Sequence, residues 1–247
     1  DQNEIRIYAA PLDSLGTSNI HWKSICEMHD EVTGFAVYGD DIFLLTHRSA
    51  PRFKVIKTSV RNPDLANAVI VVPESEEVLQ DIYTVKDALY VRVLADGLDR
   101  LLRIPYDEVL KPEYIPIPFA GSVHVGKTDP RIRGVIFSTS TWTNSGGIYI
   151  YDPKENRIFD TGLQPRGPYD APGDLVAEEV KVRSHDGVLV PLSIIHKKNI
   201  VLDGSNPAVL DGYGAYGISS KPFYDHALYA WYERGGIYAV AHVRGGG

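Results

Sequence analysis

Two tyrosines and three glycines follow one short apolar run, VLDGYGAYGISS, which covers Val209 to Ser220. Tyr213 lies between Gly212 and Gly214, and Tyr216 follows three residues after the first tyrosine. A phenol hydroxyl can donate a hydrogen bond, and glycine lets a backbone turn sharply and approach a substrate closely. The residues alone leave two interpretations open: Tyr213 donates to a reacting group, or it only packs where a strand ends.

Other chemical motifs are missing from the sequence. No serine lies in a G-x-S-x-G motif, and the nearest match, LDSLG around Ser14, lacks the first glycine. EMHDE, from Glu27 to Glu31, gathers possible metal ligands, but an acidic surface turn is the favoured interpretation. GSVHVGK, from Gly121 to Lys127, lacks the spacing of a phosphate-binding loop. We therefore expect no metal and no cofactor.

The composition predicts a globular protein. Of 247 residues, 44% are apolar and 23% are charged, which is enough for a substantial core. The net charge of -7 argues against a nucleic-acid partner. Cys26 is the one cysteine, so no intrachain disulfide can form. No apolar run approaches the ~18 residues of a membrane span, so we expect no membrane contact.

The first two thirds of the sequence repeat. Phe43, Tyr90 and Phe137 each directly follow Ile or Leu, and each is 47 residues from the next. The next strand candidates keep the same step and begin at Arg52, Asp99 and Gly146. Each unit is rich in β-branched and aromatic residues that alternate with period two, and Gly, Asp, Asn and Pro separate the runs. The pattern therefore predicts a strand, a turn and a second strand in each unit.

A repeat of this length made of short antiparallel strands is typical of a β-propeller blade. We predict a partial β-propeller of about three and a half blades in residues 1–172. A β-sandwich with accidental spacing is the alternative. So few blades leave a sheet edge open, so we expect the propeller to be incomplete.

The pattern changes after LQPRGPYDAPGD, from Leu163 to Asp174, which holds three prolines and two glycines and predicts a domain boundary. The order strand, helix, strand in residues 173–247 indicates the beginning of a parallel α/β sheet. A single helical crossover cannot cover both faces of such a sheet, so we expect this sheet to be incomplete. The predicted elements are a hairpin of Glu179–Ser184 and Val188–His196 turning at His185-Asp186-Gly187, a short buried strand at Ala208–Leu210, a helix from Pro222 to about Arg234, and a second buried strand in GIYAVAHV.

Two long motifs carry a resemblance to a known family. VPLSIIHKKNIVLDGSNPAVLDGYGAYG, from Val190 to Gly217, and GGIYAVAHVRGGG, from Gly235 to Gly247, resemble the prolyl oligopeptidase family of serine peptidases. The resemblance implies a seven-bladed propeller that caps an α/β-hydrolase domain, with the active site between them. Residues 1–172 would be part of the propeller, and residues 173–247 the N-terminal part of the hydrolase domain. It also implies a monomeric cytoplasmic or periplasmic enzyme that cleaves short peptides.

The resemblance also implies roles for the site residues. Tyr213 would donate its hydroxyl to the oxyanion, with Gly212 and Gly214 shaping the turn around it. Tyr216 would line the pocket for a proline ring, or simply pack against the following helix. Arg244, in HVRGGG, is expected to be a structural donor. The family's nucleophile, acid and base fall beyond the last motif, so we expect this chain to be a middle piece that is inactive by itself.

Three functions remain open for the intact protein. The first is a serine endopeptidase that cleaves short peptides after proline. The second is an oligopeptidase B-like enzyme that cleaves after Lys or Arg. The third, from another class, is a catalytically inactive propeller that serves as a binding module.

Overall fold

The computed structural model describes residues 2–95, 97–107, 111–201, 203–216 and 218–245. By their internal contacts the residues form two compact units. The first unit comprises Asp1–Ile117, Lys127–Val135 and Tyr151–Arg157, and the second comprises Pro118–Gly126, Ile136–Ile150 and Ile158–Gly247. Among the residues described, no helix is long and apolar enough to span a membrane.

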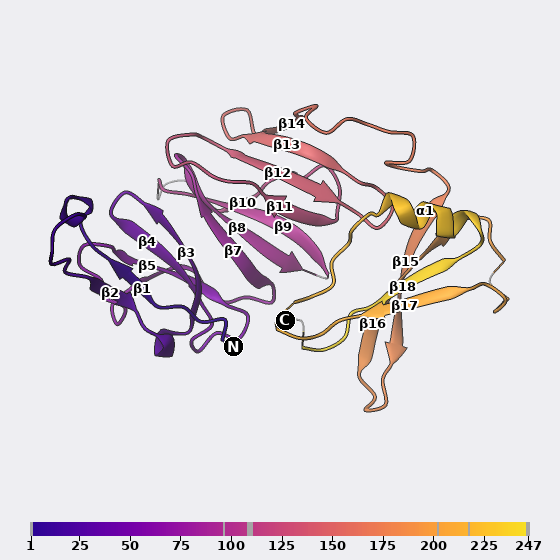
Figure 1. The fold of residues 1–247 in the computed structure, drawn as a ribbon, viewed down its shortest axis with the longest axis horizontal. Coiled ribbons are helices and arrows are strands. Elements are labelled where there is room, and N and C mark those ends of the chain that lie inside the picture. The colour runs from indigo at the N-terminus through magenta and orange to yellow at the C-terminus, as the bar shows by residue number, and fades with distance from the viewer. Residues whose placement is uncertain (1, 96, 108–110, 202, 217, 246–247) are drawn as a thin grey trace. The chain divides into compact units, whose positions relative to one another are not determined.

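Short strands dominate the sequence before the linker (Figure 1). One two-stranded sheet is followed by three four-stranded sheets, and in each of them strands that are consecutive in the chain pair with one another. The sheets are β1 (Ile7–Ala9) and β2 (Lys23–Cys26); β3 (Val32–Tyr38), β4 (Asp41–Thr46), β5 (Lys54–Ser59) and β6 (Val69–Val72); β7 (Val78–Thr84), β8 (Ala88–Ala95), β9 (Leu98–Pro105) and β10 (Glu113–Tyr114); and β11 (Ser122–Val125), β12 (Val135–Ser140), β13 (Gly147–Asp152) and β14 (Arg157–Asp160). Two short 3-10 turns, Leu12–Ser14 and Met28–Asp30, precede β2 and β3.

The sequence repeat of 47 residues corresponds to one four-stranded sheet. Phe43, Tyr90 and Phe137 lie in β4, β8 and β12, the second strand of each sheet, and none is more than 3% exposed. The predicted following strands are β5, β9 and β13, the third strand of each sheet. The predicted repeat of strand, turn and strand is therefore confirmed.

Strand β4 is buried on both faces because sheets of the first unit pack against each other. Phe43 and Leu45 belong to a core shared with β7, β8 and β9. Ile42 and Leu44, which point to the opposite face, belong to a second core that includes Ile25 of β2. Full burial of one such side chain stabilises the fold by roughly 1.5–3 kcal/mol. Stacked sheets with apolar faces thus account for the continuous apolar run in β4.

Hydrogen bonds also connect equivalent positions of successive repeats. The backbone N–H of Gly134 donates to Oδ1 of Asp87 at 2.8 Å, and the two residues are 47 positions apart. The Thr84 hydroxyl donates to the carbonyl oxygen of Val37 at 2.8 Å, across the same separation. Neighbouring repeats are therefore joined at fixed register by polar contacts as well as by apolar packing.

From Leu175 onward, the residues that the structure describes form a mixed sheet with one helix (Figure 1). Its strands are β15 (Leu175–Arg183), β16 (Leu189–Lys197), β17 (Ala208–Gly212) and β18 (Ile237–Ala241), in the order β15-β16-β18-β17, and α1 is His226–Glu233. The hairpin β15–β16 is antiparallel and β17 pairs with β18 in parallel. The predicted hairpin turn, strand, helix and parallel strand are confirmed.

Two details of these predictions are wrong. The helix begins at His226 rather than at Pro222, because the Asp225 side chain caps it by accepting a hydrogen bond from the Ala227 N–H at 2.8 Å. The strand at Ala208–Leu210 is exposed rather than buried, and Leu210 is 70% exposed. Its exposure follows from its place at the edge of the four-stranded sheet.

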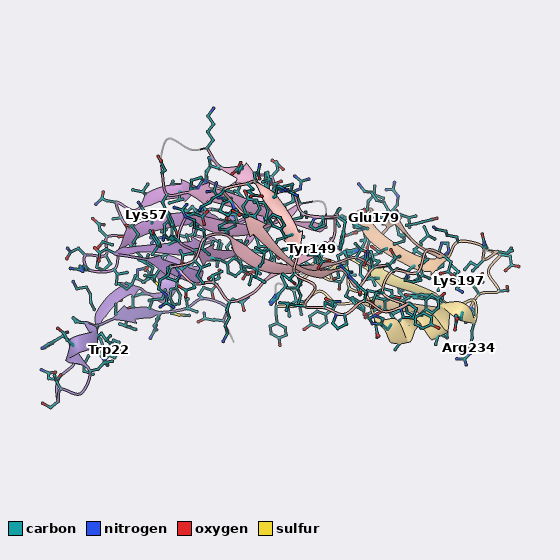
Figure 2. All side chains as sticks on the ribbon, turned by 90° about the horizontal axis from the view of Figure 1, so that it is seen from above. Trp22, Lys57, Tyr149, Glu179, Lys197 and Arg234 are labelled. Atoms are coloured by element: carbon teal, nitrogen blue, oxygen red, sulfur yellow. The ribbon has the colours of Figure 1, made fainter. Side chains whose placement is uncertain are left out.

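The proline-rich linker is fixed to the sheet and helix of the second unit. His226 Nε2 lies 2.5 Å from Oδ1 of Asp170. Lys197, labelled in Figure 2, forms an ion pair of 2.9 Å with Asp174, and its Nζ lies 5.1 Å from the ring centroid of Tyr229 in α1. The boundary at residues 172 and 173 stays a prediction, but the linker itself is attached to structure at several points.

Candidate functional site

The two glycine-rich motifs meet at one edge of the mixed sheet. Because β17 and β18 are parallel neighbours with Gly212 opposite Ala241, Tyr213 and His242 leave their strands side by side. Ligands of open α/β sheets bind outside the carboxyl ends of the strands. The sheet topology therefore gathers the residues of both motifs where such a site belongs.

The two loops that follow these strands touch backbone to backbone. A Cβ added to Gly214 would lie within 3.0 Å of the carbonyl oxygen of Arg244, closer than real Cβ atoms come. Gly245, at φ +95°, would meet the carbonyl oxygen of Gly214 in the same way. A Cβ on Gly212 would lie 3.4 Å from the carbonyl oxygen of Ala241, an ordinary contact. Close packing therefore requires glycine at residue 214 but not at residue 212.

Both tyrosines reach solvent at this edge. Tyr213 is 46% exposed, and its hydroxyl has no hydrogen-bond partner among the residues that the structure describes. Tyr216 is 69% exposed and has φ +56° inside a turn closed by the Ile218 N–H and the Ala215 carbonyl oxygen at 3.0 Å. A left-handed φ in a residue other than glycine costs about 1–3 kcal/mol and is commonest at functional sites. The chemical roles of both residues stay predictions.

Arg244 is a structural donor, as predicted. Its Nη1 lies 2.5 Å from Oδ2 of Asp186, in the turn of the β15–β16 hairpin. The hydrogen bond from the Val188 N–H, at 3.2 Å, and then the guanidinium lower the pKa of Asp186 below its usual value. The ion pair attaches the loop after β18 to the hairpin.

His242 lies at the candidate site, and the sequence analysis did not single it out. Its Nδ1 lies 3.1 Å from the carbonyl oxygen of Ser220 and its Nε2 lies 2.8 Å from the hydroxyl of Ser193. The available sequence signal is a histidine directly after an apolar strand, in a glycine-rich motif. Nothing in the sequence pairs it with Ser193, which is 49 residues away.

The described residues contain no group of three or more His, Cys, Asp and Glu side chains that could hold a metal ion. EMHDE instead forms a 3-10 turn at Met28–Asp30, in which the side chains of Glu27 and Asp30 cap each other's backbone N–H groups. The carboxylates of this motif are thus engaged in local structure.

Comparison with known proteins identifies the fold of the stacked sheets and the family to which the chain belongs. The model for the N-terminal β-propeller domain of prolyl oligopeptidase matches residues 3–159, which makes the stacked sheets propeller blades and rules out a sandwich. The chain belongs to the prolyl oligopeptidase family of serine peptidases.

Individual relatives match most of this chain. Prolyl endopeptidase from Elizabethkingia meningoseptica is 29% identical over 210 residues, which cover 85% of this chain and 29% of that protein. Prolyl oligopeptidase B from Galerina marginata, in a structure with a 25mer macrocyclization substrate, has TM-score 0.84 and 22% identity over 99% of this chain and 35% of its own. Oligopeptidase B from Leishmania major has TM-score 0.84 and 19% identity over 98% of this chain and 35% of its own. The chain therefore spans about a third of the length of such relatives.

Proposed function

We propose that the full-length protein is a serine endopeptidase that cleaves short peptides after proline, with Tyr213 as an oxyanion-hole donor. The observation that carries this proposal is the position of Tyr213: an exposed phenol at the carboxyl edge of β17, beside the glycine-rich loop after β18. Because the chain spans only about a third of the length of its relatives, the proposal concerns the full-length protein rather than these 247 residues. The 247 residues alone, which contain no G-x-S-x-G motif, are proposed to be inactive.

The chemistry of the phenol supports this role. Attack of a serine on a peptide carbonyl turns the carbonyl oxygen into an oxyanion, and a preplaced donor stabilises that charge more than it stabilises the substrate. The Tyr213 side chain is exposed, so its hydroxyl is accessible to a reacting group. Loss of one such donor lowers kcat by roughly 10²–10³.

The uncovered face of the mixed sheet supports a larger α/β-hydrolase domain. Helix α1 packs on the face that carries Ile195. On the opposite face, Val180 is 40% exposed, Val182 is 48% exposed and Leu210 is 70% exposed. Sheets with parallel strands and helical crossovers are covered on both faces. We therefore propose that residues 173–247 are the first part of an α/β-hydrolase domain.

Peptides are the proposed substrates because a relative of this fold has been observed with one. Prolyl oligopeptidase B from Galerina marginata holds a 25mer macrocyclization substrate. The exposed and strained Tyr216, three residues after Tyr213, is proposed to contact the proline ring, since an aromatic face packs well on an apolar ring. No nucleic acid or membrane is part of the proposal.

The test uses purified full-length protein and chromogenic peptides that end in proline, arginine or lysine before the leaving group. We expect the prolyl peptide to be cleaved fastest. Preferred cleavage after arginine or lysine would favour an oligopeptidase B-like enzyme, a candidate supported by the fold shared with the Leishmania major protein. Absence of cleavage in every peptide would leave only the binding-module hypothesis.

Two matched variants test the residue roles. Tyr213→Phe removes one hydroxyl and should lower kcat by roughly 10²–10³. Tyr216→Phe removes a hydroxyl from the same segment but keeps the ring, so it should leave kcat near that of the unmodified protein. An unchanged kcat in Tyr213→Phe would remove Tyr213 from the mechanism.

A further inference from the structure

His242 connects the segment that carries Tyr213 to the middle of the sheet. Its backbone N–H donates to the carbonyl oxygen of Pro191 at 3.0 Å, so the residue continues the contact between β18 and β16. Its ring makes two further hydrogen bonds. Because the carbonyl oxygen of Ser220 can only accept, Nδ1 carries the proton that it donates at 3.1 Å. Nε2 is then the acceptor of the hydrogen bond that the Ser193 hydroxyl donates, at 2.8 Å.

The two partners of the ring differ in how firmly they are held. Ser193 is 4% exposed and lies inside β16, between the neighbouring strands β15 and β18. Ser220 lies at the far end of the Tyr213 segment, which we define as the described residues 213–216 and 218–220. The near end of this segment is fixed by the pairing of Gly212 with Ala241. His242 therefore fixes the far end of the segment to a buried strand.

An aromatic side chain from the propeller packs against the same histidine. Trp142 lies between β12 and β13, inside the range matched by the propeller model. Its ring centroid lies 6.3 Å from that of His242 and 5.5 Å from that of Phe223, each at an interplanar angle of 64°. All three residues belong to the second compact unit. The indole thus makes an edge contact with the imidazole on one side of its ring.

We propose that His242 is a positioning residue for Tyr213: it holds the Tyr213 segment in one conformation, and Trp142 holds the His242 ring. The inference rests on the proposed function of Tyr213 as an oxyanion donor. A donor must lie within a few tenths of an ångström of its productive position, and a misplacement of about 1 Å can cost about 10²-fold in rate. His242 needs no contact with substrate to exert this effect, because it acts through Ser220 and the segment between.

A double-mutant cycle in the full-length protein tests the inference with the chromogenic prolyl or arginyl peptide that is cleaved fastest. His242→Ala should lower kcat by about 10–100-fold and leave KM within about twofold, because the segment loses its fixed conformation rather than its peptide contacts. In a Tyr213→Phe background the same change should lower kcat by less than about threefold, because the donor is already gone. An unchanged kcat in His242→Ala, or a loss that multiplies fully with that of Tyr213→Phe, overturns the inference.

Two conservative variants separate positioning from simple loss of folding. His242→Asn keeps a donor near the place of Nδ1 and should retain the hydrogen bond to Ser220, so its kcat should stay within about fivefold of the unmodified protein. His242→Gln places its amide nearer to Ser193 and should behave like His242→Ala. Both variants replace the ring with an amide and differ only in the length of the side chain, and so in which partner the amide can reach. Equal kcat values in the two variants would therefore contradict the inference.

A second readout does not require activity. Hydrogen exchange of the backbone amides in residues 213–216 and 218–220 should be faster in His242→Ala and in Trp142→Ala than in the unmodified protein, while exchange in β8 should not change. Unchanged exchange in the segment would overturn the inference even if no peptide is cleaved. A normal rate in Tyr213→Phe would instead overturn the proposed function, and with it the role of His242 in catalysis.

Discussion

Asp87 offers the sharpest test of how the repeats are held together. Its side chain is 2% exposed and accepts hydrogen bonds from Arg103 Nε at 3.0 Å, from the Gly134 N–H at 2.8 Å and from the Tyr90 hydroxyl at 3.3 Å. Asp40 occupies the same position one repeat earlier, but its side chain is 53% exposed and pairs with Arg61, which is 82% exposed. The chain thus contains a matched pair of aspartates that differ mainly in burial.

The contacts of Asp87 set the expected magnitude. Asp87→Ala removes one partner of a buried ion pair, which costs about 3–5 kcal/mol. Arg103 keeps a second carboxylate, Glu113, at 2.9 Å, which moderates that loss. The Gly134 N–H loses its acceptor, and an unsatisfied buried donor costs about 1–3 kcal/mol. We therefore expect a total of about 3–5 kcal/mol in the free energy of unfolding, against less than about 1 kcal/mol for Asp40→Ala, whose ion pair is exposed.

Urea unfolding of the full-length protein, followed by circular dichroism, measures both losses. At a slope of about 3 kcal/mol per M, the Asp87→Ala midpoint should fall by roughly 1 M or more, while that of Asp40→Ala should barely move. Asp87→Asn keeps an acceptor for the Gly134 N–H and loses only the charge, so its midpoint should lie between the two. Equal shifts in Asp87→Ala and Asp40→Ala would refute the argument that the buried contact between repeats carries the stability.

Two further predictions concern the loops of the site. Gly214→Ala should lower the free energy of unfolding by about 1–3 kcal/mol and reduce kcat, because the new Cβ has no room beside the Arg244 carbonyl. Gly212→Ala should be tolerated, because a Cβ at that position makes only an ordinary contact. Thermal melts and peptide cleavage of both variants check the difference, and equal behaviour of the two would contradict the prediction. Because the pKa of Asp186 is lowered in the folded protein, its carboxylate stabilises the fold at pH values above 3.8, the usual pKa of this group. This contribution is lost as the pH falls through the lower folded-state pKa. The difference in urea midpoint between the unmodified protein and Asp186→Asn should therefore be largest near pH 7 and shrink below about pH 4, and a difference that is constant with pH would argue against a role for its charge.

Elements with strong local signals were predictable from the sequence. The blades follow from alternation, because Phe43, Tyr90 and Phe137 recur at one step and each is buried in the second strand of its sheet. The hairpin turn follows from the Asp-Gly pair, and Gly187 indeed adopts φ +85°. Both kinds of signal lie within a few residues of the structure that they specify.

Features set by distant partners were not predictable. The apolar residues of β17 resemble those of a buried strand, but the strand lies at the edge of its sheet, where Leu210 is exposed. The capping side chain of Asp225 starts α1 four residues later than the proline suggests. In the site, the glycine pattern indicated Tyr213 but could not indicate His242, because its role depends on a serine 49 residues away in another strand.

His242, the proposed anchor of the Tyr213 segment, has contacts from both sides of the proline-rich linker. Trp142, before the linker, packs on His242 after it. The backbone N–H of Ser145, three residues beyond Trp142, donates to the carbonyl oxygen of Asp170 at 2.7 Å, and the Asp170 side chain accepts from His226 of α1. These contacts explain why β11–β14 group largely with the α/β residues rather than with the preceding blades. A change of composition marks where one kind of sheet ends along the sequence, but packing decides which elements group together, and here a propeller loop packs against His242, which lies after the linker.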